Sequence, residues 1–188
     1  HTASLNYTLL DGANLEGATL NKADLKRANL VGANLTKALL FEAHLDGADA
    51  TGAIFHKAKM ARVELIGGTF DNADLSYIDM REGRLGFASF VGANLSESWL
   101  HVTQLSRANF TDANLYHTSL YSAEMVKSIF INADLSYADL RRADLREANF
   151  NNANLTGAYL RGALILEAIV DNANFTDADL PIGFTPPD

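Results

Sequence analysis

Hydrophobic residues recur at every fifth position along almost the whole chain. From Leu5 to Leu180, the 36 positions of this series hold Leu, Phe, Met, Ile or Val, except at Ala50. Two residues before each of them lies a second, small position, which is Ala in 27 of the 36 cases. Each unit therefore reads small, polar, large, polar, polar, and a repeat of this kind governs the fold class.

Residues two positions apart point to the same side of an extended strand, whereas a helix needs apolar residues three and four positions apart. The two polar residues that follow break the alternation, so we expect the chain to turn after each short strand. The units at residues 13–15 (AlaAsnLeu), 23–25 (AlaAspLeu) and 108–110 (AlaAsnPhe) resemble the consensus A(D/N)LXX of the pentapeptide-repeat family.

The resemblance extends over 180 of the 188 residues. It implies an all-β fold, a right-handed quadrilateral parallel β-helix, with four repeats per turn and about nine four-sided coils. We expect residues 1–180 to form this solenoid and residues 181–188 to form a C-terminal cap or tail, in which Ile182 and Phe184 cover the last coil.

Four sides per coil would place residues 20 positions apart above one another, and the phenylalanines fit this spacing. Five of them follow one another at intervals of 20: Phe70, Phe90, Phe110, Phe130 and Phe150. We number the faces first to fourth by their initial central residues, Leu5, Leu10, Leu15 and Leu20. The second face is then predicted to hold an aromatic ladder.

The corner after the second face holds only Gly, Asn or Asp, from Gly12 to Asn172. These residues tolerate positive φ, so we predict a type II turn with a left-handed residue at this corner alone. The other corners carry Lys, Arg, Glu, Tyr and Phe, for which we expect negative φ. The Ala rule fails mostly between Val63 and Ser128, where we expect less ideal coils.

The composition limits the function classes. The net charge of -8 disfavours direct binding to nucleic acid or to an anionic membrane. Cys is absent, which excludes disulfides and cysteine nucleophiles. No apolar run approaches the roughly 18 residues of a membrane span. The chain begins at His1 without a leader and looks truncated, so the compartment stays open between cytoplasm, periplasm and thylakoid lumen.

Most uncompensated acids fall on the second and third faces, which together carry -8. Some members of the family inhibit DNA gyrase, which the resemblance attributes to a rod that mimics DNA. Duplex DNA carries one charge per roughly 1.7 Å, so a rod roughly 43 Å long would need about 25 charges. The ten acids of these faces fall short of that density. The candidate mimic residues are Asp11, Asp49, Asp71, Asp74, Asp112, Asp134, Asp171 and Asp177.

An unbroken rod lacks the concave sites that catalysis needs, so we assign no catalytic, cofactor-binding or metal-binding residue and predict that the chain is not an enzyme. His44 lies between Asp24 and Glu64 on adjacent coils. This arrangement suits a weak surface metal site, but a solvated row of charges explains it better.

Aromatic residues gather on the fourth face and at the corner that leads into it. Exposed Trp and Tyr beside Arg are typical of protein contacts. Aromatic residues that only cover the flanks of strands would give the same pattern. We predict a rigid scaffold that binds an unknown protein, with a DNA-mimicking topoisomerase inhibitor as the alternative and a homodimer through a coil end as a further possibility. The candidate patch comprises Tyr77, Arg81, Trp99, His101, Tyr116, His117, Tyr121 and Tyr137.

Overall fold

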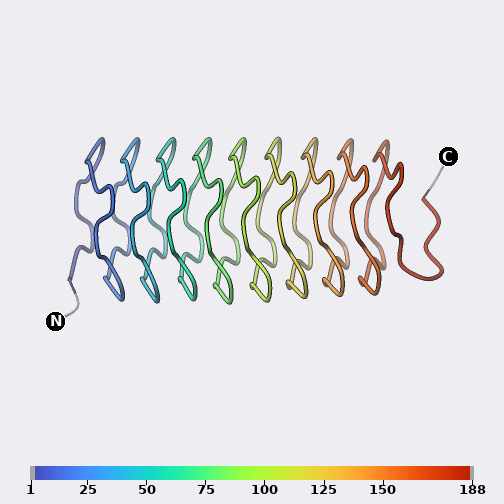
Figure 1. The fold of residues 1–188 in the computed structure, drawn as a ribbon, viewed down its shortest axis with the longest axis horizontal. Coiled ribbons are helices and arrows are strands. Elements are labelled where there is room, and N and C mark those ends of the chain that lie inside the picture. Colours follow the sequence, from blue (N-terminus) through green and yellow to red (C-terminus); the bar gives the residue numbers. More distant parts are fainter. Residues whose placement is uncertain (1–2, 187–188) are drawn as a thin grey trace.

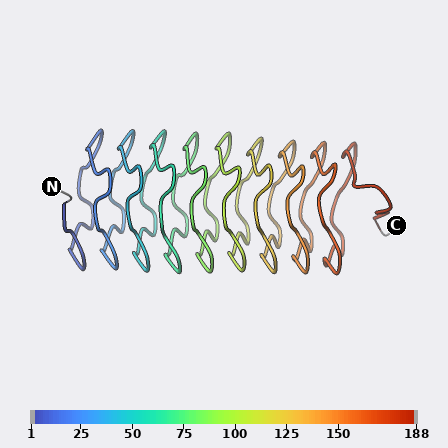
Figure 2. The ribbon, with the colours of Figure 1, turned by 90° about the horizontal axis from the view of Figure 1, so that it is seen from below.

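The chain winds into a single rod of stacked coils, with the two termini at opposite ends (Figure 1). The computed structural model describes residues 3–186. The residue before a central position forms an isolated parallel β-bridge with the residue 20 positions further on. Asp24 pairs in this way with His44, and His44 with Glu64. Units of five residues repeated with a period of 20 give four sides per coil. A view turned by 90° shows the corners aligned in rows along the rod (Figure 2).

Each side is held by one bridge residue rather than by a longer named strand, and the described residues contain no helix. Each central residue from Leu5 to Leu160 donates its N–H to the next coil, as in Leu25 N to His44 O (2.7 Å). The preceding residue donates to the coil before it, as in Asp24 N to Ala3 O (2.9 Å). Almost every backbone donor of an interior coil therefore has a partner despite the short sides.

The central and small positions form one continuous core. The five phenylalanines of the second face are fully buried and stack with centroids 4.9–5.6 Å apart, which confirms the predicted ladder. From Phe90 to Phe150 the ring planes differ by only 2–5°. Such offset parallel contacts stabilise the core beyond the area that they bury.

The start of the ladder explains two departures from the repeat. Ala50 leaves space one coil before Phe70, and the Phe55 ring lies 5.6 Å from the Phe70 ring beside it. A Cβ added at Gly68 would lie 2.9 Å from the Phe70 ring. An Ala at position 68 would therefore require the Phe70 ring to shift.

Positive φ is found at all four corners, which contradicts the prediction of one left-handed corner. Every corner from Tyr7 to Asp177 has a residue with φ between 53° and 75° at the same place, including Lys22 (60°) and Val102 (60°). The preceding central carbonyl accepts a bond across nearly every turn, as in Ala28 N to Leu25 O (3.0 Å). Four sharp turns per coil demand the same backbone at each corner, so closure of the coil overrides the local preference of Lys or Val.

Replacement of Val102 by Gly is expected to stabilise the rod. A left-handed backbone destabilises a β-branched residue by roughly 1–2 kcal/mol. Gly removes this strain, but it loses about 0.5–1 kcal/mol more in conformational entropy when the chain folds. A net gain of about 0.5–1 kcal/mol should appear in chemical unfolding. The same change at Gln104, a bridge residue without positive φ, should destabilise. A loss of stability in Val102→Gly would show that the corner carries no strain.

The C-terminal segment covers the last coil only in part. Phe184 packs against Phe175 with centroids 5.6 Å apart, as expected of a cap. Ile182, which we predicted to share that role, is fully exposed. The prediction was wrong for Ile182 because the chain turns at residues 182 and 183 and directs only Phe184 back to the core.

Candidate functional site

Paired Asp and Arg side chains lie across the fourth face. In two units they flank the same central residue, so both point outward from one side of the coil. Arg81 donates from Nε and Nη2 to the two carboxylate oxygens of Asp79 at 2.7 and 2.8 Å. Arg141 makes the same two-pronged contact with Asp139 at 2.8 and 2.7 Å. These contacts fix the guanidinium planes on the face.

The pairs hold both partners in their charged forms. Partial burial raises the pKa of Asp79, but the hydrogen bonds from Arg81 outweigh it and leave that pKa below its usual value. Asp139 behaves in the same way beside Arg141. Since the pKa of Arg141 is raised mainly by its bond to Asp139, this cation stays charged at any physiological pH.

Trp99 and Tyr121, two aromatic residues of this face, each lie next to an arginine of an adjacent coil. The Trp99 side chain is 54% exposed, and the Arg81 guanidinium carbon lies 5.8 Å from its ring centre. The guanidinium carbons of Arg141 and Arg142 both lie 5.8 Å from the centre of the Tyr121 ring. Cation–π contacts of this kind restrain the orientation of a large aromatic ring through one of its faces. The opposite face can then contact a partner.

The remaining candidate residues form two further groups at the corner before the fourth face. Tyr116, His117 and Tyr137 contact one another, and the rings of His117 and Tyr137 stack at 5.2 Å. Tyr77 instead contacts His56 and the Lys57 ammonium group. The predicted patch is thus several small clusters along the rod rather than one continuous aromatic surface.

The prediction of the patch missed Asp139, Arg141, Arg142 and Tyr159, although the sequence contained the signal. Each lies 20 positions from Ser119, Tyr121, Ser122 or Asp139, and would be placed on the same face by the spacing that located Trp99 and Tyr121. His101 lies between the two Asp–Arg pairs and favours the ionised forms of Asp79 and Asp139.

Two shallow hollows, each of about 330 Å³, lie on either side of Arg141. One has aromatic walls formed by His117, Tyr137 and Tyr159, with Thr118, Ser119 and Asp139 as further lining. The other is lined by Tyr121, Arg141, Arg142, Arg161 and Gly162 and contains no acidic side chain. The fourth face therefore offers an aromatic recess beside a cationic one.

The eight predicted acidic residues lie on the second and third faces, where several accept bonds from neighbouring coils. Asp71 accepts from Val91 N at 3.0 Å, and Asp112 accepts from Asn132 Nδ2 at 2.9 Å. Within residues 3–186, every ion pair lies on the first or fourth face or its corner. The negative charge of the second and third faces is therefore not compensated by ion pairs.

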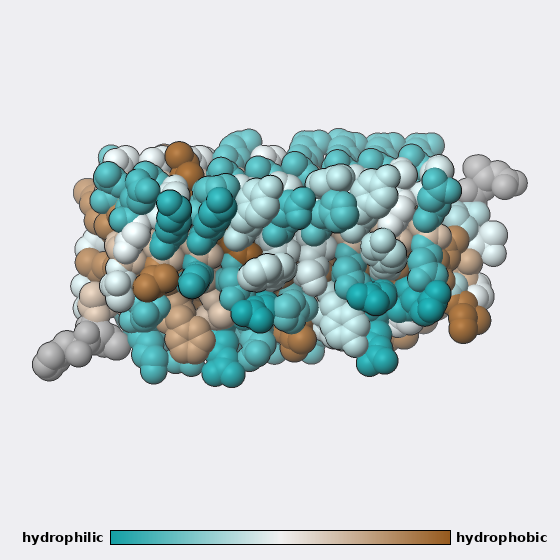
Figure 3. Space-filling model, viewed as in Figure 1, coloured by the Kyte–Doolittle hydropathy of each residue, from teal (hydrophilic) through white to brown (hydrophobic). Residues whose placement is uncertain are grey.

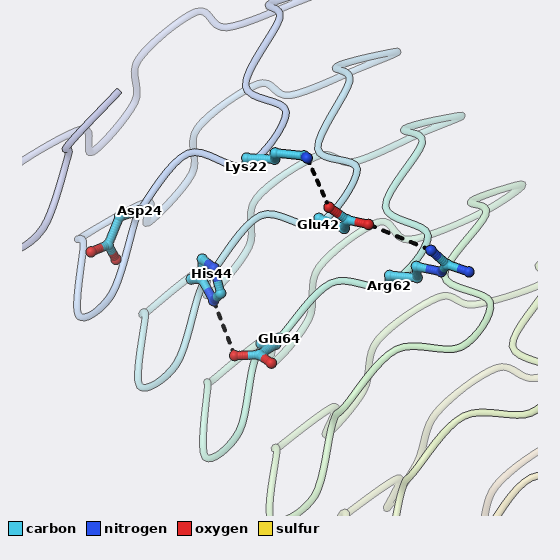
Figure 4. A pocket seen from close by; sticks show the side chains of 6 residues that line it. All are labelled: Lys22, Asp24, Glu42, His44, Arg62 and Glu64. Atoms are coloured by element: carbon cyan, nitrogen blue, oxygen red, sulfur yellow. Dashed lines mark hydrogen bonds and ion pairs between the residues drawn. The ribbon is translucent and has the colours of Figure 1, made fainter. Parts of the chain in front are cut away.

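A network of alternating charges surrounds His44 on the early coils (Figure 4). His44 Nδ1 lies 3.0 Å from Glu64 Oε2, while Glu42 lies between Lys22 and Arg62. Asp46 completes a group of three possible metal ligands with His44 and Glu64. Glu64 also accepts from Arg84 Nη1 through Oε1 at 3.0 Å, so both of its carboxylate oxygens have a partner in this network.

Exposed large hydrophobic side chains are distributed along the rod, from Tyr7 to Ile182. Figure 3 shows that hydrophilic side chains and side chains of intermediate hydropathy dominate this side of the rod, with hydrophobic ones scattered among them. Over the described part of the chain there is no helix of the length and hydrophobicity needed to cross a bilayer.

A family model for pentapeptide repeats matches residues 3–36, 38–76, 88–125 and 128–165 in eight copies. Since these ranges cover well over half of the sequence, the chain belongs to the pentapeptide-repeat family. Comparison with curated proteins gives no significant match.

Solved structures of the family share the right-handed β-helix. HetL from the cyanobacterium Nostoc sp. strain PCC 7120, a pentapeptide-repeat protein involved in the regulation of heterocyst differentiation, is 30% identical. The match covers 97% of this chain and 91% of HetL with a TM-score of 0.55. A trypsin-treated form of QnrB1, a plasmid-mediated fluoroquinolone resistance protein, is 20% identical over 95% of this chain and 89% of that one. Its TM-score of 0.65 supports the fold alone.

Proposed function

We propose that this protein is a non-enzymatic scaffold that binds another protein through its fourth face. The observation that carries the proposal is the exposed Trp99 ring held against Arg81, with Tyr121 held between Arg141 and Arg142 further along the rod. Rings restrained in this way lose little conformational entropy when a partner binds. Trp, Tyr and Arg are also the residues that dominate binding energies at protein interfaces.

The rod itself favours this role. Bonds between coils and a continuous core hold the outward side chains at fixed spacing, so the binding face is preorganised. The similarity to HetL, which is described as involved in a regulatory process, agrees with a protein that acts through contacts.

The test is quantitative capture of partners from a native host extract by the parent protein and by Trp99→Ala and Tyr121→Ala. Loss of an interfacial Trp or Tyr typically costs about 2 kcal/mol, so captured partners should bind roughly thirtyfold more weakly. Tyr7→Ala is the matched control, because Tyr7 is also exposed and stacks with Arg27 on another face. If both fourth-face variants retain every partner of the parent, the proposal fails.

A second candidate function is inhibition or modulation of DNA gyrase or another topoisomerase by DNA mimicry. The observation that favours it is the negative charge of two adjacent faces that lack ion pairs. A protein surface with a strong single sign of charge attracts the basic DNA-binding grooves of such enzymes. Its charge density is below that of DNA, which limits the affinity that charge alone supplies.

A supercoiling assay with bacterial gyrase separates the two functions. A mimic should inhibit, and the triple variant Asp71→Asn, Asp112→Asn, Asp171→Asn should inhibit at least tenfold less because the second face loses most of its charge. The control removes three charges from the first face through Asp46→Asn, Glu124→Gln and Glu167→Gln. Absence of inhibition by the parent at tens of micromolar, or equal inhibition by both triple variants, would exclude the mimic.

A further inference from the structure

The two hollows of the fourth face differ in a way that specifies a partner. We infer that they bind an extended acidic segment of a protein, which places a bulky apolar side chain in the aromatic hollow and an acidic side chain in the cationic one. This inference rests on the proposed function and names the chemistry of the partner at that face.

Charge complementarity identifies the acid. The cationic hollow is lined by three arginines and by no acidic residue. Arg141 is bound to Asp139 through Nε and Nη2, whereas Arg142 makes no ion pair with any described residue. Arg161 is 76% exposed and reaches only Asp179, at 3.3 Å. The guanidinium group of Arg142, together with Nε and Nη1 of Arg161, is therefore available for a carboxylate. Arg readily forms bidentate hydrogen bonds with carboxylates.

The surrounding charges direct an acidic segment to this place. The protein carries a net charge of -8, and the acids of its second and third faces form no ion pair within residues 3–186. An acidic partner is repelled by these faces, within a Debye length of about 8 Å at physiological salt. The arginine cluster thus gives both attraction and orientation.

The aromatic hollow suits an apolar side chain. His117, Tyr137 and Tyr159 form its walls, and the small Ser119 lies in the gap between Trp99 and Asp139 along the rod. The Tyr159 side chain is 46% exposed, so its ring offers apolar surface to a ligand. A bulky residue that enters such a recess supplies most of the binding energy of a short segment.

The spacing of the hollows fits a strand. The aromatic hollow is built at Ser119, Asp139 and Tyr159, and the cationic hollow at the residues two positions later, Tyr121, Arg141 and Arg161. Two residues of extended chain span about 6.4–6.8 Å, and side chains at this interval lie on the same side. The partner should therefore cross the rod at right angles to its axis, with its apolar and acidic residues two positions apart.

Selection of random short peptides displayed on phage against the whole protein tests the inference. Selected peptides should combine an aromatic or large aliphatic residue with Asp or Glu two positions away. Fluorescence polarisation then gives the Kd of the best peptide for the parent and for Arg142→Glu, Arg161→Glu and Tyr159→Ala. We expect each variant to weaken binding roughly tenfold or more, because a buried charge pair or an anchor is lost.

Arg107→Glu is the control, because it makes the same change of net charge at a corner of the first face, where Arg107 contacts Phe87. This variant should bind like the parent. Peptides that lose affinity with Trp99→Ala but bind Arg142→Glu and Arg161→Glu like the parent would overturn the acidic specificity and leave the proposed scaffold intact. Peptides that ignore every fourth-face variant, or a selection that yields no binder, would overturn the inference.

Discussion

Phe110→Ala should destabilise the rod by about 3–5 kcal/mol, the usual loss when a buried Phe becomes Ala. Phe110 is fully buried and stacks on Phe90 at 4.9 Å and on Phe130 at 5.1 Å. The substitution removes both ring contacts and leaves a cavity in the middle of the ladder. The backbone of the neighbouring coils cannot move in to fill it, because bridges hold each coil to the coils on both sides.

Chemical unfolding followed by circular dichroism measures this loss. Phe110→Leu should cost clearly less than Phe110→Ala, since Leu fills the central position on most other sides. Phe41→Ala serves as the surface control, because Phe41 is 38% exposed and contacts Arg62 rather than another ring. A loss below about 1 kcal/mol for Phe110→Ala would mean that the coils relax into the cavity.

Much of the fold could be predicted because one repeated constraint determines it. A large apolar residue at every fifth position and a small one two residues earlier allow only short strands joined by turns. The period of 20 followed from Phe70 to Phe150, and the stacked rings confirm it. The spacing therefore predicted which residues form the core.

The corners were mispredicted because residue preference was taken as evidence for backbone conformation. Gly and Asn gather at one corner, yet Lys22 and Val102 adopt the same positive φ elsewhere. The asparagines of that corner have another role. Asn132 donates to Asp112, and Asn152 donates to Asn132 at 3.2 Å, so side-chain amides bond along the rod axis. Asn is therefore favoured at this corner both because its side-chain amide bonds to the adjacent coil and because it tolerates positive φ.

The candidate site was only partly predictable for a related reason. The 20-residue rule places side chains on a face, but it does not give the direction in which a long side chain turns. Arg141 folds back onto Asp139, and both Arg141 and Arg142 lie over the Tyr121 ring. The two hollows depend on these directions, so they became visible only in the structure.

The middle coils depart from the Ala rule partly because hydroxyl groups take over hydrogen bonds of the turns. Ile78 N donates to Ser98 Oγ of the next coil at 3.1 Å, and Ser98 Oγ donates to Leu75 O at 2.7 Å. The hydroxyl group is fully buried and bridges the two backbone groups that bond directly at other corners, such as Ala73 N and Phe70 O. The departure at Ser98 is therefore a specific bond between coils.

Ser98→Ala should accordingly cost about 1–3 kcal/mol, because a buried N–H and a buried C=O lose their partner together. Ser128→Ala is the matched control. Ser128 Oγ also donates to a carbonyl, Leu105 O, but Ala108 N bonds to that carbonyl as well. The control should therefore cost only about 0.5–1 kcal/mol. Equal losses of unfolding free energy in the two variants would show that Ile78 N and Leu75 O bond directly once the hydroxyl group is removed. The bonds of Ser98 would then add no stability beyond that of an ordinary turn.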